Sequence, residues 1–451
     1  MPDRLSARAT LALVTDEFAE LPHPARRSGP DGPLAWQGYD ASRARAADRT
    51  GEDESVVCGT ARVEGTEAVL IAFEFGFLGG SLGERTGDRL QAAYTHARDH
   101  RLPVVALIAT GGSRMQEGMV ALAQLQRVAR QSVLVREAGL AQLAVLRDPT
   151  TGGGWATLGA GADVVLALPG AQVGFAGSRV RPAGADPAAY TAEAQVAAGA
   201  ADAVVHPGEL RRTLGRWLRL LTGPSAEPAP PPRPLGATVL PASGWEAVLR
   251  ARSPQRPRAQ EYLDAYFTER AAIGGDRCGG TDDGMLCGFG AHAGRTVAYA
   301  AQTGTATRPA GYRTAARLIR LADRLGIPVL TLVDTPGAAS DAEAERQGAG
   351  AAIADVFGAV AAARTPVTTL VIGEGGSGGA LALAAPDNTW ATPDSYFSVI
   401  APELATAILK RPPEEVQSTA GQLRIRPQDL AELGLARTSE RLFPGTGDRR
   451  P

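Results

Sequence analysis

The chain repeats itself at a nearly constant spacing of 225 residues. The apolar run LPVVALIATGG at 102–112 corresponds to IPVLTLVDTPG at 327–337, and both end in a glycine turn. Farther along, a second glycine-rich turn aligns Gly153 with Gly378 at the same spacing. Agreement at several separate landmarks is hard to obtain by chance, and self-similarity at a fixed period indicates duplicated structure. The 451 residues are therefore predicted to form two copies of one fold.

Each copy reads as alternating strands and helices. The strands, such as VVALIAT at 104–110 and VTTLVIG at 367–373, are short and apolar on both faces, as in a sheet covered on both sides. The helix GYRTAARLIRLADRLG at 311–326 has alanine and leucine along one face and arginine along the other. The pattern predicts an α/β fold with right-handed crossovers. Its glycine turns then lie at the carboxyl ends of strands, where open α/β folds bind ligands.

A proline-rich segment with almost no charge separates the two copies. It covers residues 223–241, GPSAEPAPPPRPLGATVLP, and its composition predicts a semi-rigid, extended linker. The predicted domains are therefore residues 1–222 and residues 242–451.

The glycine-rich stretch GEGGSGG at 373–379 fits two known signatures incompletely. It contains G-x-G-x-x-G, but a dinucleotide fold also needs an acidic residue at the end of the next strand, whereas Asp394 follows a proline in a turn. It also contains G-x-S-x-G around Ser377, but the nucleophile elbow of hydrolases needs a histidine later in the chain, and the last histidine is His292. Both interpretations are disfavoured, since the first copy preserves neither pattern.

What the two copies share is a pair of glycines at a strand-to-helix turn, so the shared feature is backbone rather than side chain. Glycine lets a ligand approach the main chain closely, and amides at the start of a helix point outward with a favourable dipole. This arrangement suits an oxyanion hole, and two holes imply two carbonyl-bearing ligands. The alternative is that these glycines only permit close packing of helix on strand.

Composition excludes several classes of function. The 46 basic and 48 acidic residues give a net charge of −2, without the basic excess of a nucleic-acid-binding protein. Three cysteines cannot form a disulfide framework, which favours a reducing compartment. The N-terminus lacks a signal-peptide pattern, and no apolar run reaches the roughly 20 residues that span a bilayer. We expect a soluble cytoplasmic protein; His96 and His100 share a helix face, but no metal site is predicted.

Around the glycine turns the sequence resembles a known family. The first half is similar to the β subunit of bacterial acetyl-CoA carboxylase carboxyltransferase in FGFLGGSLGE (75–84), ATGGSRMQEG (109–118), DPTTGGGWA (148–156) and VGFAGSRV (173–180). The second half is similar to the α subunit in SPQRPRAQEYL (253–263), GYRTAARLIRLADRLGIPVLTLVDTPGA (311–338), VIGEGGSGGALAL (371–383) and YFSVIAPELATAILK (396–410). The chain thus resembles a natural β–α fusion. The resemblance implies an internal duplication of two tandem crotonase-like domains (ClpP/crotonase superfamily).

The resemblance implies the carboxyltransferase component of a biotin-dependent acyl-CoA carboxylase. The first domain would bind acyl-CoA and the second carboxybiotin, and CO2 would move to the α-carbon of acetyl-CoA or another short acyl-CoA. The product would be malonyl-CoA or a homologue, a precursor for fatty acid or polyketide synthesis. Biotin carboxylase and the biotin carboxyl carrier protein would be separate partners, and the chain would form a homodimer or larger homo-oligomer. No nucleic acid or membrane partner is expected.

The resemblance also implies a set of site residues. The thioester oxygen would be held by Gly152 and Gly153, and the ureido oxygen of biotin by Gly378, Gly379 and Ala380. The same pockets would be lined by Gly111, Gly112, Gly337 and Ala338. Arg114 would either aid coenzyme A binding or form a structural ion pair with Glu117, and Lys410 is a candidate contact for biotin or coenzyme A.

The sequence departs from the family in two respects. The four-cysteine zinc ribbon usual in the β subunit is missing, since Cys58 is the only cysteine of the first half. Biotin cannot be attached in the usual Met-Lys-Met motif, because the only lysine is Lys410 in ILKRPP. Two alternatives stay open: a malonyl-thioester (malonate) decarboxylase of the same fold, and a non-catalytic carboxylase scaffold. The acyl group is also open, since Trp155 either narrows the acyl pocket or packs in the core.

Overall fold

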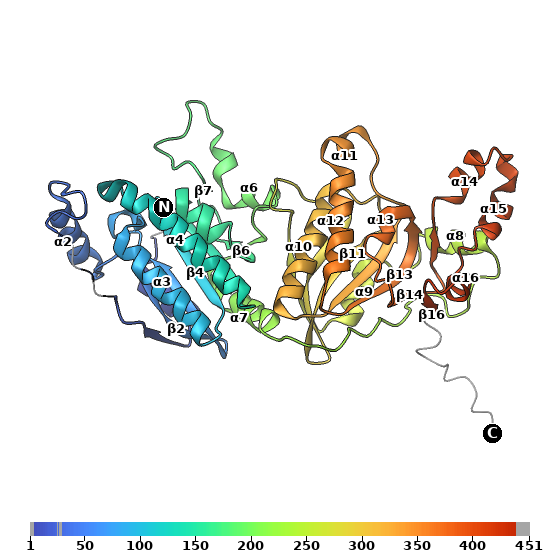
Figure 1. Ribbon diagram of the computed structural model, residues 1–451, viewed down its shortest axis with the longest axis horizontal. Coiled ribbons are helices and arrows are strands. Elements are labelled where there is room, and N and C mark those ends of the chain that lie inside the picture. The colour runs from blue at the N-terminus through green and yellow to red at the C-terminus, as the bar shows by residue number, and fades with distance from the viewer. Residues whose placement is uncertain (1–3, 25, 27–28, 439–451) are drawn as a thin grey trace, which may run out of the picture. The chain divides into compact units, whose positions relative to one another are not determined.

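The computed structural model describes residues 4–24, 26 and 29–438. The chain divides into two compact units, Met1–Thr222 with Arg277–Gly279, and Gly223–Asp276 with Gly280–Pro451. In the described ranges each unit contains one eight-stranded sheet with helices against it (Figure 1). The α/β fold predicted from the alternation of strands and helices is confirmed.

The first unit is built on a mixed sheet in the order β1-β2-β3-β4-β5-β6-β8, with β7 also paired to β5. The β1–β2 and β2–β3 pairs are antiparallel and the others parallel. The strands are β1 (Glu17–Glu20), β2 (Val56–Val63), β3 (Thr66–Phe73), β4 (Val104–Thr110), β5 (Gln142–Thr151), β6 (Val164–Ala167), β7 (Val173–Gly174) and β8 (Ala203–Val204). Every residue of β4 is buried, as expected of a central strand covered on both faces.

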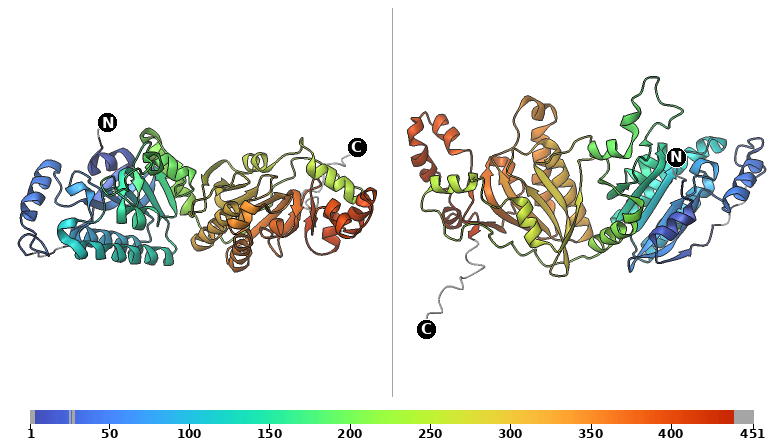
Figure 2. Two further views of the ribbon diagram at one scale, coloured as in Figure 1. Left: turned by 90° about the horizontal axis from the view of Figure 1, so that it is seen from above. Right: turned by 180° about the vertical axis from the view of Figure 1, so that it is seen from behind.

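Helices cover both faces of this first sheet. α3 (Glu84–Asp99) and α4 (Gly118–Glu137) lie on one face, and α1 (Ala7–Val14) and α7 (Pro207–Leu221) lie on the other (Figures 1 and 2). The other helical segments are α2 (Tyr39–Thr50), η1 (Leu78–Gly80), η2 (Met115–Glu117), α5 (Gly152–Gly154), η3 (Trp155–Gly159), η4 (Pro187–Tyr190) and α6 (Ala192–Ala197).

The second unit repeats this plan in the order β16-β14-β13-β12-β11-β10-β9, with β15 also paired to β13. The β9–β10 and β10–β11 pairs are antiparallel and the others parallel. The strands are β9 (Glu269–Ile273), β10 (Met285–His292), β11 (Arg295–Gln302), β12 (Val329–Thr335), β13 (Val367–Gly376), β14 (Thr389–Ala391), β15 (Tyr396–Ser398) and β16 (Arg437–Thr438).

The helices of the second unit also cover both faces of its sheet. α10 (Pro309–Leu325) and α12 (Ala349–Ala362) pack together on one face, and α9 (Ala259–Tyr266) packs its tyrosines and leucine against the other (Figures 1 and 2). The other helical segments are α8 (Gly244–Arg252), α11 (Ala342–Arg346), α13 (Ser377–Leu381), α14 (Pro402–Ile408), η5 (Pro413–Glu415), α15 (Val416–Gln422) and α16 (Pro427–Glu432).

The two sheets carry the same irregularity at the same place. In the β4–β5 pair the register shifts between Ile108 and Thr110, and in the β12–β13 pair it shifts between Val333 and Thr335. These positions are again 225 residues apart. An irregularity of this kind bends a strand and re-aims the residues after it. In both units those residues form a glycine turn, so the duplication extends to the backbone detail that sets up the site.

The proline-rich segment 223–241 packs along the second unit and does not hang free as a linker. Ala229 is 2% exposed, and its carbonyl accepts a hydrogen bond from the Thr368 hydroxyl at 2.7 Å. The Tyr266 hydroxyl donates to the Pro230 carbonyl at 2.8 Å. An extended proline-rich segment makes no internal hydrogen bonds, so its carbonyls are available to α9 and β13 beside it.

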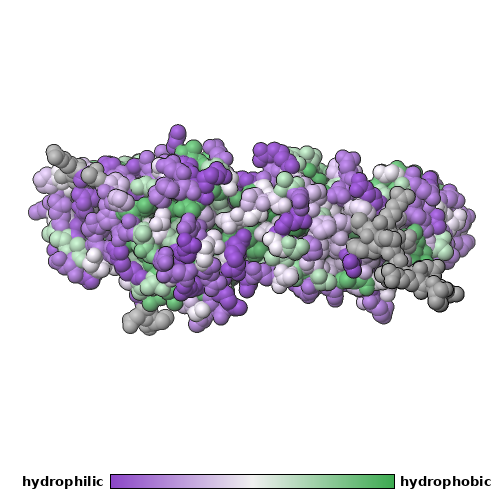
Figure 3. Space-filling view, turned by 90° about the horizontal axis from the view of Figure 1, so that it is seen from below, coloured by the Kyte–Doolittle hydropathy of each residue, from purple (hydrophilic) through white to green (hydrophobic). Residues whose placement is uncertain are grey.

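The molecular surface shows no continuous apolar belt on the face seen in Figure 3, where hydrophobic residues are scattered among hydrophilic ones. None of the helices in the described ranges has both the length and the apolar character needed to cross a bilayer.

Candidate active site

The first glycine turn of unit 1 follows β4, which ends at Thr110. The amide of Gly112 donates to the Thr110 hydroxyl at 3.1 Å, and the amide of Gly111 donates to the carbonyl of Gly79 at 2.9 Å. Gly112 has a φ of +110°, a conformation that favours glycine. The two glycines predicted to line the pocket therefore shape this turn, and both of their amides are engaged within the chain.

The second glycine turn of unit 1 is the start of α5. Gly152 has a φ of +63°, and its amide donates to the carbonyl of Phe175 at 3.1 Å. This corrects the prediction that the Gly152 amide holds a thioester oxygen, because that N–H already has a partner. The amides of Gly153 and Gly154 lie in the first helical turn, where N–H groups have no partner inside the helix. A Cβ on Gly154 would lie 2.3 Å from Cγ2 of the buried Thr110, so a side chain would collide there.

A further amide at this site was not predicted from the sequence. Ser113 forms an isolated parallel bridge with Leu82. The Leu82 amide donates to the Gly112 carbonyl and the Arg114 amide donates to the Leu82 carbonyl, both at 2.9 Å. The bridge therefore engages the neighbours of Ser113, whose own amide donates to none of the described residues. Unit 1 thus offers this turn amide together with two amides from the first turn of α5.

A buried ion pair lies behind the first turn. Arg114 is 1% exposed, and its guanidinium binds both carboxylate oxygens of Glu54 and donates to the Tyr39 hydroxyl at 3.1 Å. It also donates to the Ser81 carbonyl at 2.7 Å and lies 3.5 Å from the Glu117 carboxylate. Of the two predicted roles for Arg114, the structure supports the ion pair. Contact with coenzyme A would need an exposed guanidinium, and this one faces the interior.

Charge pairing controls the ionisation of this buried cluster. Burial alone would raise the pKa of the Glu54 carboxyl, but the adjacent Arg114 guanidinium holds that pKa below its ordinary value. Burial raises the pKa of the Tyr39 phenol above its usual range, so the hydroxyl stays protonated. At neutral pH the cluster is an ionised pair with a neutral phenol, and it anchors the turn that carries the Ser113 amide.

Unit 2 repeats the first turn with different side chains around it. β12 ends at Thr335, whose hydroxyl accepts a hydrogen bond from the Gly337 amide at 3.1 Å. Thr307 and Ala338 form an isolated parallel bridge, and the Ala339 amide donates to the Thr307 carbonyl at 2.9 Å. The Ala338 amide has no hydrogen-bond acceptor in the described part of the chain, which matches the turn amide of unit 1.

The second donor set of unit 2 is the first turn of α13. The helix begins at Ser377, which is exposed and has a φ of +60°, a conformation that strains any residue with a side chain. The amides of Gly378 and Gly379 come next. Ala380 is the fourth residue of α13, where helical geometry first supplies a partner, so its amide is a weaker donor than predicted. A Cβ on Gly379 would lie 2.6 Å from the Ala338 nitrogen, so the helix and the turn border one small space.

A second buried ion pair lies behind the turn of unit 2. The Arg256 guanidinium donates to the Asp334 carboxylate at 2.5 Å, and Arg258 donates to its other oxygen at 3.2 Å. The Glu374 amide also donates to Asp334 at 3.2 Å, which ties β13 to the end of β12. A Cβ on Gly373 would lie 2.2 Å from the Arg256 guanidinium, so glycine makes room for this charge.

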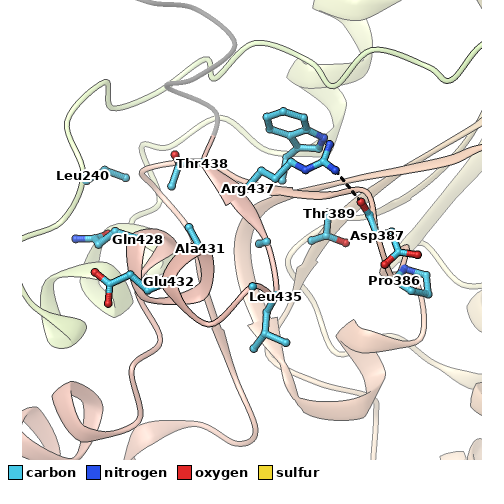
Figure 4. A pocket seen from close by; sticks show the side chains of 13 residues that line it. Leu240, Pro386, Asp387, Thr389, Gln428, Ala431, Glu432, Leu435, Arg437 and Thr438 are labelled. Carbon is cyan, nitrogen blue, oxygen red and sulfur yellow. Dashed lines mark hydrogen bonds between the residues drawn. The ribbon is translucent and has the colours of Figure 1, made fainter.

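Two other features lie apart from these turns. Lys410 is exposed in the turn after α14, so its contact with biotin or coenzyme A stays a prediction. A pocket of about 680 Å³ opens beside α16, β14 and β16, where Arg437 donates to the Asp387 carbonyl at 3.2 Å (Figure 4). No candidate glycine lines this pocket, so it is not the candidate site. Across the described ranges, no three His, Cys, Asp or Glu side chains converge as a metal site requires.

Comparison with known proteins places both halves in one group. Residues 35–202 match the carboxyl transferase domain family, and residues 239–438 match the acetyl co-enzyme A carboxylase carboxyltransferase-like family. The acetyl-coenzyme A carboxylase carboxyl transferase subunits beta/alpha of Saccharopolyspora erythraea is 39% identical over 421 residues, which cover 88% of this chain and 73% of that relative. A probable biotin-dependent acyl-coenzyme A carboxylase beta3 subunit of Mycobacterium tuberculosis is 34% identical over 429 residues, which cover 91% of this chain and 84% of that protein.

Among solved structures, transcarboxylase 12S matches with a TM-score of 0.78 at 20% identity, covering 99% of this chain and 91% of that one. At this identity the match speaks for the fold alone, and it confirms the predicted tandem crotonase-like pair. The predicted resemblance to the β subunit in the first half and the α subunit in the second is also confirmed. The chain belongs to the acetyl-CoA carboxylase carboxyl transferase family, in its fused β/α arrangement.

Proposed function

We propose that this chain transfers a carboxyl group from carboxybiotin to the α-carbon of a short acyl-CoA, as the carboxyltransferase of a biotin-dependent acyl-CoA carboxylase. The observation that carries the proposal is the repeated backbone site. Each unit has a turn amide without a partner in the described ranges, and the first-turn amides of a short helix. Such donors stabilise a negative oxygen, and one donor contributes about 3 kcal/mol in a dry site. Two such sites suit a reaction in which negative charge develops on two carbonyl oxygens.

Unit 1 is assigned the acyl-CoA thioester. The amides of Ser113, Gly153 and Gly154 hold the thioester oxygen as an enolate forms at the neighbouring carbon. Gly152 contributes its positive φ, which turns the chain from β5 into α5. The buried Arg114 positions the turn and does not touch the substrate.

Unit 2 is assigned the biotin. The amides of Ala338, Gly378 and Gly379 would hold the ureido oxygen. Carboxybiotin would supply the CO2 and, once the CO2 is released, the basic ureido nitrogen that takes the proton from the acyl α-carbon. The residues present fit this group, because a ureido carbonyl needs N–H donors and the two borders of this space are backbone amides.

The acyl group is proposed to be acetyl, because the relative in Saccharopolyspora erythraea is named for acetyl-coenzyme A carboxylase. Trp155 does not decide the matter. Its side chain is 8% exposed and belongs to the core of unit 1, where a Cβ on Gly159 would lie 2.5 Å from the indole ring.

The partners follow from the same proposal. The proposed partners are a biotin carboxyl carrier protein and a biotin carboxylase. A carrier protein is proposed because the only lysine of the sequence, Lys410, stands in ILKRPP and not in the Met-Lys-Met motif to which biotin is usually attached. Exposed apolar side chains favour a homodimer or larger homo-oligomer, notably Met115 and Met119 near α4 and Leu404 and Ile408 on α14. The three cysteines form no disulfide in the described ranges, which favours the cytoplasm as the location.

The test measures the reaction in reverse, with malonyl-CoA as carboxyl donor and free biotin as acceptor. We expect acetyl-CoA to appear only when biotin is present, together with an equal amount of carboxybiotin. Release of CO2 without biotin would instead establish the malonyl-thioester decarboxylase. If there is no turnover under either condition, the non-catalytic carboxylase scaffold is the interpretation that remains. Running the reaction with methylmalonyl-CoA in place of malonyl-CoA separates acetyl from propionyl specificity.

A further inference from the structure

The carbonyl of Gly379 is held by two buried side chains from other elements. The Tyr312 hydroxyl on α10 donates to this oxygen at 3.0 Å, and Gln302 Nε2 at the end of β11 donates at 3.2 Å. Tyr312 is 1% exposed and Gln302 is 0% exposed. A longer helix would pair this carbonyl with the amide four residues on, but α13 ends at Leu381, and the Leu383 amide donates to Ala380 at 3.2 Å. The two side chains therefore replace a missing helical bond.

Holding this carbonyl fixes more than one oxygen atom. The peptide unit is planar, so the Gly379 carbonyl and the Ala380 amide move as one body. The amides of Gly378 and Gly379 belong to the same five-residue helix, which has no other turn to brace it. The two hydrogen bonds to the Gly379 carbonyl thus set the direction in which the first-turn amides of α13 point.

The same cluster reaches the opposite border of the site. Gln302 Nε2 also donates to the Thr307 hydroxyl at 3.2 Å. Thr307 in turn forms the parallel bridge with Ala338, and its carbonyl accepts the Ala339 amide at 2.9 Å. Thr307 is fully buried, so this connection is shielded from water. One cluster thus braces both α13 and the turn that carries the Ala338 amide.

The side-chain amide of Gln302 is oriented so that its Nε2 donates both of the hydrogen bonds described above. Its Oε1 is buried and has no hydrogen-bond partner in the described ranges, an arrangement that costs stability. Turning the amide over would place Oε1 against the Gly379 carbonyl, which accepts hydrogen bonds and cannot donate one, so the bond to that carbonyl would be lost. Burial also raises the pKa of the Tyr312 phenol above its usual range, so the hydroxyl remains a donor at neutral pH.

Unit 1 has no such cluster at the corresponding place. There a hydroxyl of the same helical segment, that of Thr157, donates at 2.7 Å to the carbonyl of Gly153, which corresponds to Gly378 rather than to Gly379. Phe73, which ends β3 as Gln302 ends β11, has no hydrogen-bonding side chain. The cluster is therefore specific to the second site, and changes in it leave the first site intact.

We propose that Gln302, Thr307 and Tyr312 are positioning residues that set the geometry of the second oxyanion hole, the one that the proposed function assigns to biotin. They touch no substrate. Their contribution is to keep the α13 amides and the Ala338 amide aimed at one point, before negative charge develops there. An interaction of this kind acts on the transition state, so its loss lowers kcat more than it raises KM.

The test uses Tyr312→Phe, Gln302→Met and the double variant in the full chain. Tyr312→Phe removes one donor and keeps the ring, and Gln302→Met keeps a side chain of similar length but has no N–H to donate. Tyr266→Phe is the matched control, because it also removes a buried phenol-to-carbonyl hydrogen bond, to Pro230 at 2.8 Å in the same unit. Transfer from malonyl-CoA to free biotin gives kcat and both KM values. Thermal unfolding sets an assay temperature at which every variant is folded.

We expect kcat to fall about 10-fold in each single variant and about 100-fold in the double variant, with the KM for malonyl-CoA unchanged within twofold. Tyr266→Phe keeps the wild-type kcat. Wild-type kcat in the double variant would overturn the positioning role, as would an equal loss in Tyr266→Phe or a loss confined to the KM for malonyl-CoA. Absence of transfer in the wild-type chain would overturn the proposed function instead, so the two failures are distinct.

Discussion

Gly379→Ala adds a single methyl group between the two donor sets of unit 2. The new Cβ would lie 2.5 Å from the Tyr312 oxygen, 2.6 Å from the Ala338 nitrogen and 3.1 Å from the Ala338 Cβ. Carbon needs about 3.3 Å or more from nitrogen or oxygen, so at least one neighbour has to move by about 0.7 Å. Tyr312 is held by its hydrogen bond and Ala338 by its bridge. The substitution therefore displaces a donor whichever group moves.

The displacement affects two quantities, kcat and folding stability. Loss of one oxyanion donor lowers kcat by about 100-fold to 1,000-fold, equivalent to about 3–4 kcal/mol. Inserting a methyl group into a close-packed region costs about 1–3 kcal/mol of folding stability. A domain of ordinary stability, about 5–15 kcal/mol, survives that cost. The expected signature is a folded protein with at least 100-fold lower kcat.

The assay is carboxyl transfer from malonyl-CoA to free biotin, with urea unfolding measured on the same preparations. Gly358→Ala is the matched control, because Gly358 lies inside α12 with nothing within 4 Å of its added Cβ. That change should keep kcat and raise stability by up to about 1 kcal/mol, since alanine favours helix. If Gly379→Ala retains kcat within threefold of wild type, the amides beside Gly379 are not the donors and the assignment of this hole is wrong.

Three further predictions concern stability. Glu54→Gln leaves the buried Arg114 without its closest counter-charge and should cost about 3–5 kcal/mol in urea unfolding. The pKa of Glu54 is lowered, so the folded state binds a proton at this carboxyl less readily than the unfolded state does. The stability that Glu54 contributes should therefore be complete above about pH 5 and be lost as the pH falls below about 4.3. The urea midpoint should fall between pH 7 and pH 3, and it should fall less in Glu54→Gln than in the wild-type chain. Ser377→Gly relieves a φ of +60° and should raise stability by about 1 kcal/mol, measured in the same way.

The sequence predicted the features that depend on local pattern. An offset of 225 residues revealed the duplication, and strands without a polar face revealed sheets covered on both sides. The glycine turns could be located because each combines an apolar strand, a glycine pair and an amphipathic helix within a few residues. Every one of these signals is contained in a short window, so no knowledge of the tertiary fold is required to detect it.

The partner of each polar group could not be predicted from the sequence. The Gly152 amide meets the Phe175 carbonyl, and Arg114 meets Glu54 sixty residues earlier, because the folded sheet brings these segments together. The Ser113 amide was missed for the opposite reason. Its availability depends on a bridge between two loops, and no residue type marks a backbone group that is left free.

The two units agree in backbone and differ in support, and this contrast says which features the chemistry requires. Positive φ recurs at Gly112 and Gly337, which are 225 residues apart. The buried ion pairs do not correspond: position 339, which matches Arg114, is alanine, and position 109, which matches Asp334, is also alanine. Removing one member of a buried ion pair lowers folding stability, because it leaves the other charge buried and unpaired. Such a pair can therefore be replaced only if both of its residues change together. Two different supports around one backbone geometry indicate that the amides are the functional groups, and that the charges behind them serve to hold those amides in place.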